Sequence, residues 1–134
     1  MDPFTLFALA NGAVQAVKKG CELYKETYLT KVKPYPKLRE KLRQFMEFKR
    51  HNPDDNWGAS DKFFKPGLKF FTAIPGIRHA HLAPDLFMVY RIGKANEVWL
   101  YGIFTHDDLG IGQPMNPRKQ DAAANRLARQ QFKE

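Results

Sequence analysis

Three strand-like runs of apolar residues follow one another in the second half of the chain. They are Ile77–Leu82, Leu86–Ile92 and Val98–Thr105, and their β-branched and aromatic content favours strands. The connections between them, Ala-Pro-Asp and Gly-Lys-Ala-Asn, are short enough for hairpins. The pattern therefore predicts an antiparallel meander.

Helical spacing of apolar residues predicts three helices around these strands. The first covers residues 2–26, with Asp2 as its N-cap, and the second runs from Pro36 to about Arg50. The third starts at Asn116-Pro117 and ends near Phe132.

Two further segments complete the prediction. Tyr28–Lys33 alternates and is bounded by a proline, which favours a short strand, and residues 63–74 are expected to form a loop on the core. The resulting order of elements predicts an α+β domain, in which helices cover an antiparallel sheet of about four strands and an extra helix stands at the N-terminus.

The composition is that of a globular domain. The chain has 134 residues, of which 43% are apolar, and its eleven Phe, five Tyr and two Trp are too many for a disordered chain. Its one cysteine, Cys21, excludes an intramolecular disulfide and a cysteine-based zinc site. The apolar run Phe4–Val17 is shorter than the roughly 20 residues of a membrane span, and lysines follow it. These features predict a cytoplasmic protein with no membrane partner.

The charge is strongly basic and unevenly distributed. The formal net charge is +8, and from Lys18 to Arg50 eleven basic residues outnumber four acidic ones. An excess of this size favours an anionic partner, such as nucleic acid, an acidic protein or a membrane surface. The alternative is a solvated helix face without a ligand.

Three of the four histidines lie in the predicted meander. His79 and His81 alternate along one strand and so share a face, His106 ends the last strand, and Asp85 lies in the turn after His81. Two imidazoles near an arginine can cleave RNA without a metal or other cofactor: one takes the proton of the ribose 2′-OH and the other protonates the leaving 5′-oxygen. A carboxylate such as that of Asp85 can fix a tautomer.

Other interpretations of the same residues stay open. His79 could be a histidine of the core edge, and a zinc site could use His79, His81 and His106. Arg91 could pair with an acidic neighbour across the sheet.

Two longer motifs carry a resemblance to a known family. Residues 81–92 (HLAPDLFMVYRI) and 98–109 (VWLYGIFTHDDL) resemble toxins of the RelE/ParE superfamily, in particular its YafQ-like branch. Phe48-Lys-Arg, the Pro53-Asp loop, His79-Ala-His81 and the closing helix are similar to the YafO branch. The resemblance covers about residues 28–132. It implies a ribosome-dependent mRNA endonuclease of a type II toxin–antitoxin system, with mRNA, the ribosome and a cognate antitoxin as partners.

The family pattern implies specific site residues. Its functional positions fall on His81, Asp85 and His106, which are expected to be catalytic. The cations expected to contact RNA are Arg78, His79, Arg91, Lys69, Lys41, Lys49 and Arg50.

The sequence departs from the YafQ-like pattern in two places. Gly110 stands where the YafQ-like pattern has an aromatic residue, and an upstream histidine has Lys69 or His51 as its nearest candidates. The leading arginine of the RelE branch falls near Leu86, so arginine-based catalysis does not transfer.

The N-terminal part lies outside this resemblance. Residues 1–26 are expected to form an extension to a toxin domain of residues 27–134, and they are similar to the N-termini of small phage structural proteins. The second functional hypothesis is therefore a non-catalytic binding module with a phage structural partner, in which case the protein would belong to a virion. A third, a gyrase poison of the ParE type, would not need these histidines.

Overall fold

The computed structural model of the chain describes residues 16–65 and 67–133. Its longer elements are the helices α2 (Leu23–Lys31), α3 (Pro36–His51) and α5 (Pro117–Ala128) and the strands β3 (Arg78–Ala83), β4 (Leu86–Ile92) and β5 (Val98–Phe104). The shorter ones are β1 (Val17–Gly20), β2 (Lys62–Phe63), α4 (Lys69–Ala73), the 3₁₀ turn η1 (Lys94–Asn96) and β6 (Phe132–Lys133). Among the described residues, no helix is long and apolar enough to cross a membrane.

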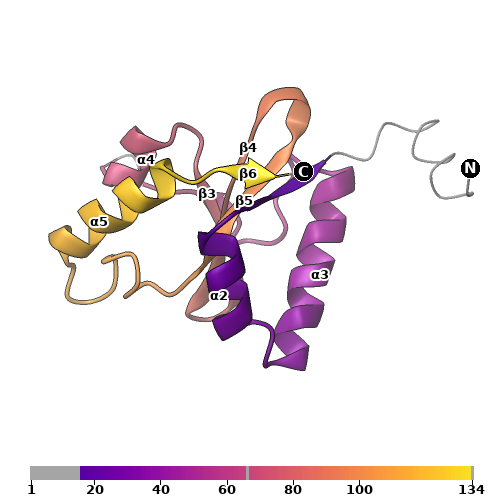
Figure 1. The fold of residues 1–134 in the computed structure, drawn as a ribbon, viewed down its shortest axis with the longest axis horizontal. Helices are drawn as coiled ribbons and strands as arrows, with labels where there is room; N and C mark the ends of the chain where they lie inside the picture. Colours follow the sequence, from indigo (N-terminus) through magenta and orange to yellow (C-terminus); the bar gives the residue numbers. More distant parts are fainter. Residues whose placement is uncertain (1–15, 66, 134) are drawn as a thin grey trace, which may run out of the picture.

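The strands form one mixed sheet in the order β2-β3-β4-β5-β1-β6 (Figure 1). The antiparallel meander β3-β4-β5 is the centre of this sheet, as the sequence predicts. β1 runs parallel to β5 and antiparallel to β6, so the sheet has more strands than the four expected.

Two helices are also confirmed. α3 begins at Pro36, where proline is tolerated because the first helical N–H has no partner in the helix. α5 begins at Pro117, and the side chain of Asn116 accepts a hydrogen bond from the Lys119 N–H at 3.2 Å. α5 ends at Ala128, earlier than expected, because Phe132 joins the sheet edge in β6.

The N-terminal expectations are corrected in the described region. The strand expected at Tyr28–Lys33 is wrong, because most of this segment is the second half of α2. The helix expected over residues 2–26 is wrong at Val17–Gly20, which form the strand β1. Residues 2–15 of that expected helix lie outside the described residues. A Cβ at Gly20 would lie 3.2 Å from the Tyr101 carbonyl oxygen, so the missing side chain lets this strand pass close to β5. Residues of the expected N-terminal extension thus belong to the sheet.

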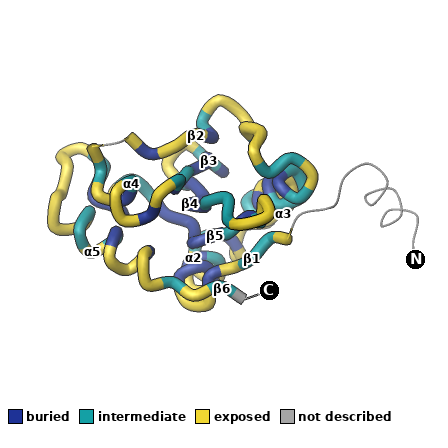
Figure 2. The backbone as a smooth tube through the Cα atoms, turned by 90° about the horizontal axis from the view of Figure 1, so that it is seen from above, coloured by how far each residue is buried: buried dark blue, intermediate teal, exposed yellow. Residues whose placement is uncertain are grey.

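The sheet separates two apolar cores. Figure 2 shows α4 and α5 on one side of the strands and α3 on the other. On one face α4 and α5 cover Phe87 and Val89, with Phe70 and Leu127 among the buried contacts. On the other face lie α3 and part of α2. The buried residues there include Leu42, Phe45, Met88, Tyr90 and Leu100. The segment expected as a loop at 63–74 supplies β2 and α4 to the first face.

A buried ion pair joins α3 to the loop before β2. Lys49 and Asp61 are fully buried, and Lys49 Nζ lies 2.7 Å from Asp61 Oδ2. Lys49 also donates to the Asp55 carbonyl oxygen at 2.6 Å, while Asp61 accepts from the Trp57 N–H at 2.7 Å and from the Tyr90 hydroxyl.

The prediction that Lys49 contacts RNA is therefore wrong. Lys49 lies four residues after Phe45 and seven after Leu42, which places it on the buried face of α3. Burial of this side chain lowers the pKa of Lys49, against the opposing pull of Asp61.

Removing one partner of this ion pair should destabilise the protein strongly. Lys49→Met leaves the Asp61 carboxylate buried without its counter-charge, so we expect a loss of about 3 kcal/mol in the free energy of unfolding, measured by urea denaturation. The control, Lys41→Met, changes an exposed residue of the same helix and should stay within about 0.5 kcal/mol of wild type. Equal stability of the two variants would contradict this role of the pair.

Candidate functional site

His81 and His106 meet at one end of the sheet. His81 comes from β3 and His106 follows the end of β5, and their ring centroids lie 5.6 Å apart. The ring of Phe87 on β4 contacts both, at 5.5 Å from His81 and 5.0 Å from His106. The antiparallel meander thus brings together two histidines that are 25 positions apart in the sequence.

Asp85 completes this cluster from the hairpin between β3 and β4. Its Oδ1 lies 2.5 Å from His106 Nδ1 and accepts the backbone N–H of His106 at 3.0 Å. These hydrogen bonds, first from the backbone and then from the ring, hold the pKa of Asp85 below its ordinary value. The ionised carboxylate fixes the tautomer in which His106 Nδ1 carries a proton, which leaves Nε2 for a ligand.

His81 is half-buried beside His106. Burial lowers the pKa of His81, and the charges of His106 and Lys62 add to this effect. Its Nδ1 is buried and has no hydrogen-bond partner among the described residues, so a proton must enter or leave through Nε2. Its backbone N–H is held by the Ser60 hydroxyl at 3.2 Å. The result is an imidazole that favours its neutral form and can accept a proton.

His79 belongs to the core rather than to the surface. It is 8% exposed and stacks on Phe64 with ring centroids 4.3 Å apart. Burial, together with the charges of His81, Lys62 and His106, lowers the pKa of His79 to about 4. His79 is therefore neutral at physiological pH and offers no charge to an RNA phosphate, contrary to the prediction.

Lys62 is the site residue that sequence reasoning missed. It is exposed on β2, directly across from His79 in the antiparallel pairing, and so lies on the histidine face of the sheet. Its charge contributes to the lowered pKa of both His79 and His81. β2 is a two-residue strand, too short to give an alternating pattern.

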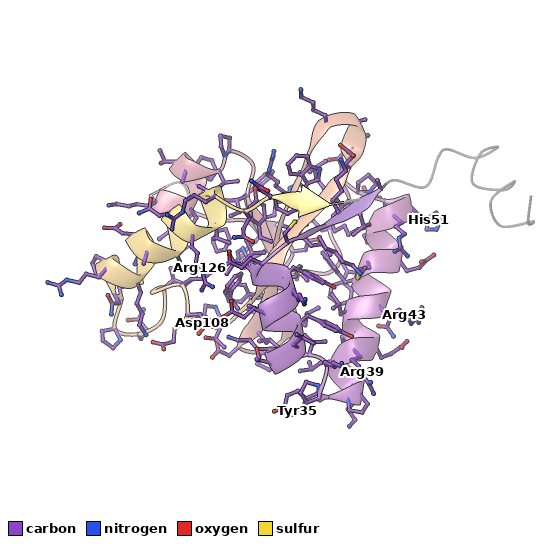
Figure 3. All side chains as sticks on the ribbon, in the orientation of Figure 1. Tyr35, Arg39, Arg43, His51, Asp108 and Arg126 are labelled. Atoms are coloured by element: carbon purple, nitrogen blue, oxygen red, sulfur yellow. The ribbon has the colours of Figure 1, made fainter. Side chains whose placement is uncertain are left out.

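Neither residue considered for the upstream histidine joins this cluster. Lys69 on α4 forms an ion pair with Asp121 at 2.6 Å. His51 ends α3 and pairs with Glu47 at 3.2 Å, at the end of that helix opposite to Tyr35 (Figure 3).

Arg78 and Arg91, the two arginines of the meander, contact aromatic rings and are not part of the histidine cluster. The guanidinium of Arg78 lies over Phe63 at 4.4 Å and 3.7 Å from Asp54. Arg78 alternates with His79 and so lies on the opposite face of the sheet from the histidines. Arg91 lies over Trp99 at 4.2 Å and donates to the Tyr101 hydroxyl at 2.9 Å, so the acidic partner considered for it is replaced by aromatic rings.

The departure at Gly110 has a backbone cause. Gly110 has φ +71°, and a Cβ there would lie 2.4 Å from the Asn116 carbonyl oxygen. An aromatic residue cannot occupy this position without moving the start of α5. Phe87 places an aromatic ring against His106 from β4 instead.

In the described part of the chain, no group of three or more His, Cys, Asp or Glu side chains is arranged to hold a metal ion.

Comparison with known structures finds a similar fold in a chain of a solved complex. One chain of the E. coli DinJ–YafQ toxin–antitoxin complex is 18% identical, with a TM-score of 0.53, over 72% of this chain and 97% of that chain. The chain has a RelE/YafQ-like fold. A second crystal structure of the E. coli DinJ–YafQ complex gives a TM-score of 0.52 at 18% identity, over 71% of this chain and 97% of that chain. No protein-family model matches the sequence, and no curated protein matches it significantly.

The buried His79 predicts an acid-sensitive fold. Its pKa is about 4 in the folded protein against an ordinary 6.5, so below pH 6.5 the unfolded chain binds a proton that the folded chain excludes. The free energy of unfolding should fall by about 3 kcal/mol between pH 6.5 and pH 4 through this residue and level off below that range.

Urea unfolding over this pH range measures the effect. His79→Gln should lack this part of the pH slope. An unchanged slope in His79→Gln would show that His79 accepts its proton freely in the folded state.

Proposed function

We propose that this protein is a toxin that cleaves mRNA on the ribosome by a metal-independent reaction through the ribose 2′-OH. The observation that carries the proposal is the cluster of His81, His106 and Asp85, in which two imidazoles lie 5.6 Å apart between centroids and one is oriented by a carboxylate. The RelE/YafQ-like fold supports the class of function.

His81 is the general base in this reaction. Burial favours its neutral form, so Nε2 can take the proton from the 2′-OH. The 2′-oxygen then bonds to phosphorus and the bond from phosphorus to the 5′-oxygen breaks. His106 enters the step as the imidazolium, with its Nδ1–H held by Asp85, and donates its Nε2 proton to that leaving oxygen. The products are a 2′,3′-cyclic phosphate and a 5′-hydroxyl.

Lys62 supplies the positive charge that the reaction needs. It is exposed on the histidine face and close enough to influence His81 electrostatically, so its ammonium group can stabilise the added negative charge on the phosphorane. Two of the cations expected to contact RNA are exposed: Lys41, and Lys69, whose side chain is 66% exposed. Because solvent and ligands can reach them, we keep both as proposed phosphate contacts.

An antitoxin is the proposed protein partner. The structural neighbours are chains of toxin–antitoxin complexes, which supports a cognate antitoxin that neutralises this chain. Action on translated mRNA places the proposed function in the bacterial cytoplasm.

The assignment of roles predicts the effect of histidine variants. His106→Ala and His81→Ala should each lower the rate of mRNA cleavage in a translating extract by about 10²-fold or more, because each removes a proton-transfer group. Expression of the wild type should arrest bacterial growth, and these variants should relieve the arrest.

His51→Ala is the matched control and should cleave as wild type does, because His51 lies at the end of α3 with Glu47. Lys62→Gln should lower the rate and Lys62→Arg should retain part of it. A zinc-selective chelator should leave cleavage unchanged. If His106→Ala cleaves mRNA at the wild-type rate, the mechanism is refuted. If the wild type neither cleaves mRNA nor arrests growth, the non-catalytic binding module is favoured.

A further inference from the structure

A hollow of about 620 Å³ lies at the outer edge of the sheet, next to the histidine cluster. It is lined by Lys62, Phe63, Phe64, Lys65, Phe71 and Gly76, which belong to β2, α4 and the residues that follow each of them. β2 is the outermost strand on this side of the sheet (Figure 2). Of the lining residues, the proposed reaction uses Lys62 alone.

Three phenylalanines make the hollow aromatic. Phe64 is buried and stacks on His79 with ring centroids 4.3 Å apart, so it connects the hollow to the core beneath the histidines. Phe71 is half-buried, and Phe63 is 50% exposed. A flat apolar ligand that covered Phe63 would remove this ring from water and gain free energy.

The ring of Phe63 is held in place from one side. The Arg78 guanidinium lies over it, 4.4 Å from the ring centroid, and Arg78 is directly opposite Phe63 in the β2–β3 pairing. A cation over one face of a ring stabilises that orientation of the ring. A ligand that stacks on the other face therefore meets a ring that has little conformational freedom left to lose.

Two lysines lie on the same edge as the rings. Lys62 and Lys65 are exposed, and neither forms an ion pair within the described part of the chain. No acidic side chain is among the described residues that line the hollow. Exposed rings beside lysines suit single-stranded nucleic acid, because bases stack on the rings while the ammonium groups attract the phosphates.

We propose that this hollow is a nucleobase subsite for single-stranded RNA, in which one base stacks on Phe63 while Lys62 and Lys65 contact the neighbouring phosphates. The charge of the lining complements RNA, whereas a second copy of the chain carries a formal net charge of +8 and would be repelled. A purine covers more of the ring than a pyrimidine does, so we expect the subsite to favour purines.

The hollow is continuous with the histidine cluster through Lys62. This lysine lies directly across from His79 and also lines the hollow. Lys62 and Phe63 are neighbours on the outermost strand, so RNA can pass from the histidine face around the sheet edge and meet both. Because paired strands lie only about 4.8 Å apart, a nucleotide close to the reacting one in the sequence can reach the hollow.

The inference rests on the proposed function in one respect: the RNA is the mRNA whose phosphate lies between His81 and His106. Base binding can still be measured without cleavage, because a 2′-O-methyl oligonucleotide has no 2′-OH to react. The binding assay and the cleavage assay therefore test the two proposals separately.

The test titrates the full chain into a fluorescein-labelled 2′-O-methyl oligoadenylate of about eight nucleotides. Fluorescence anisotropy should show binding that is roughly tenfold weaker for Phe63→Leu, which keeps an apolar side chain but removes the ring. Phe63→Tyr keeps the ring and should bind as wild type does. The matched control, Tyr35→Leu, removes a ring that is 55% exposed at the start of α3, outside the hollow, and should leave the affinity unchanged.

Salt dependence separates stacking from attraction by charge. Lys65→Gln should flatten the log–log plot of affinity against salt concentration by about one unit. Phe63→Leu should weaken binding at every salt concentration without changing this slope, since stacking releases no counterions. An abasic oligomer of the same length should bind wild type and Phe63→Leu equally, because it has no base to stack.

Several results would overturn the proposal. Equal affinity of Phe63→Leu and wild type would show that phosphates alone are bound, and an equal loss in Tyr35→Leu would show that the effect is not specific to the hollow. A dimer that Phe63→Leu disrupts would assign the hollow to a second copy. An acidic peptide that displaces the oligomer and itself loses affinity in Phe63→Leu would assign it to a protein partner.

The two assays also distinguish failure of the subsite from failure of the proposed function. If wild type cleaves mRNA but binds the adenylate and abasic oligomers equally, the subsite is rejected and the proposed function stands. If wild type binds the adenylate more tightly than the abasic oligomer but does not cleave mRNA, the subsite stands and the proposed function is rejected.

Discussion

The buried ion pair of Lys49 and Asp61 is the constraint on which the site depends. Two charges can leave water only if other polar groups satisfy them, and here the Asp55 carbonyl, the Trp57 N–H and the Tyr90 hydroxyl do so. These bonds fix the path of the loop from α3 to β2. Because Lys62 directly follows Asp61, the same bonds set where β2 begins and so place the lysine beside the histidines.

Graded burial then gives three histidines three different properties. His79 is stacked in the core and stays neutral, His81 is half-buried with a lowered pKa, and His106 lies outermost against an ionised carboxylate. Desolvation disfavours an imidazolium more strongly at greater depth. A single face of three adjacent strands thus carries a core histidine, a half-buried imidazole that favours its neutral form and an imidazole oriented by a carboxylate.

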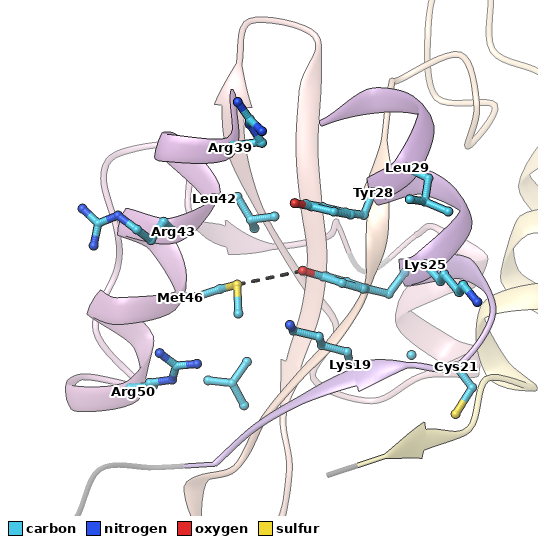
Figure 4. A pocket seen from close by; sticks show the side chains of 13 residues that line it. Lys19, Cys21, Lys25, Tyr28, Leu29, Arg39, Leu42, Arg43, Met46 and Arg50 are labelled. Atoms are coloured by element: carbon cyan, nitrogen blue, oxygen red, sulfur yellow. Dashed lines mark hydrogen bonds between the residues drawn. The ribbon is translucent and has the colours of Figure 1, made fainter. Parts of the chain in front are cut away.

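The sheet also keeps the histidine cluster apart from a groove on its other face. The histidines lie on the face covered by α4 and α5. On the other face, β1, α2 and α3 line a groove that carries lysines and arginines (Figure 4). This separation depends on β1, whose parallel pairing with β5 supplies Val17 and Lys19 to the groove.

The local spacing of apolar residues and turns determined the meander, α3 and α5, because hairpins and helices are formed by residues close in the sequence. The same meander determined that His81, Asp85 and His106 lie close together. The tertiary structure alone decided the rest. β1 pairs with a strand about 80 residues away, and a parallel pairing leaves no hairpin signal. Lys49 is buried because a carboxylate from a distant loop compensates its charge, and Lys62 reaches the site through a two-residue strand with no periodicity of its own. Long-range pairing and desolvation depend on groups that only the folded chain brings together.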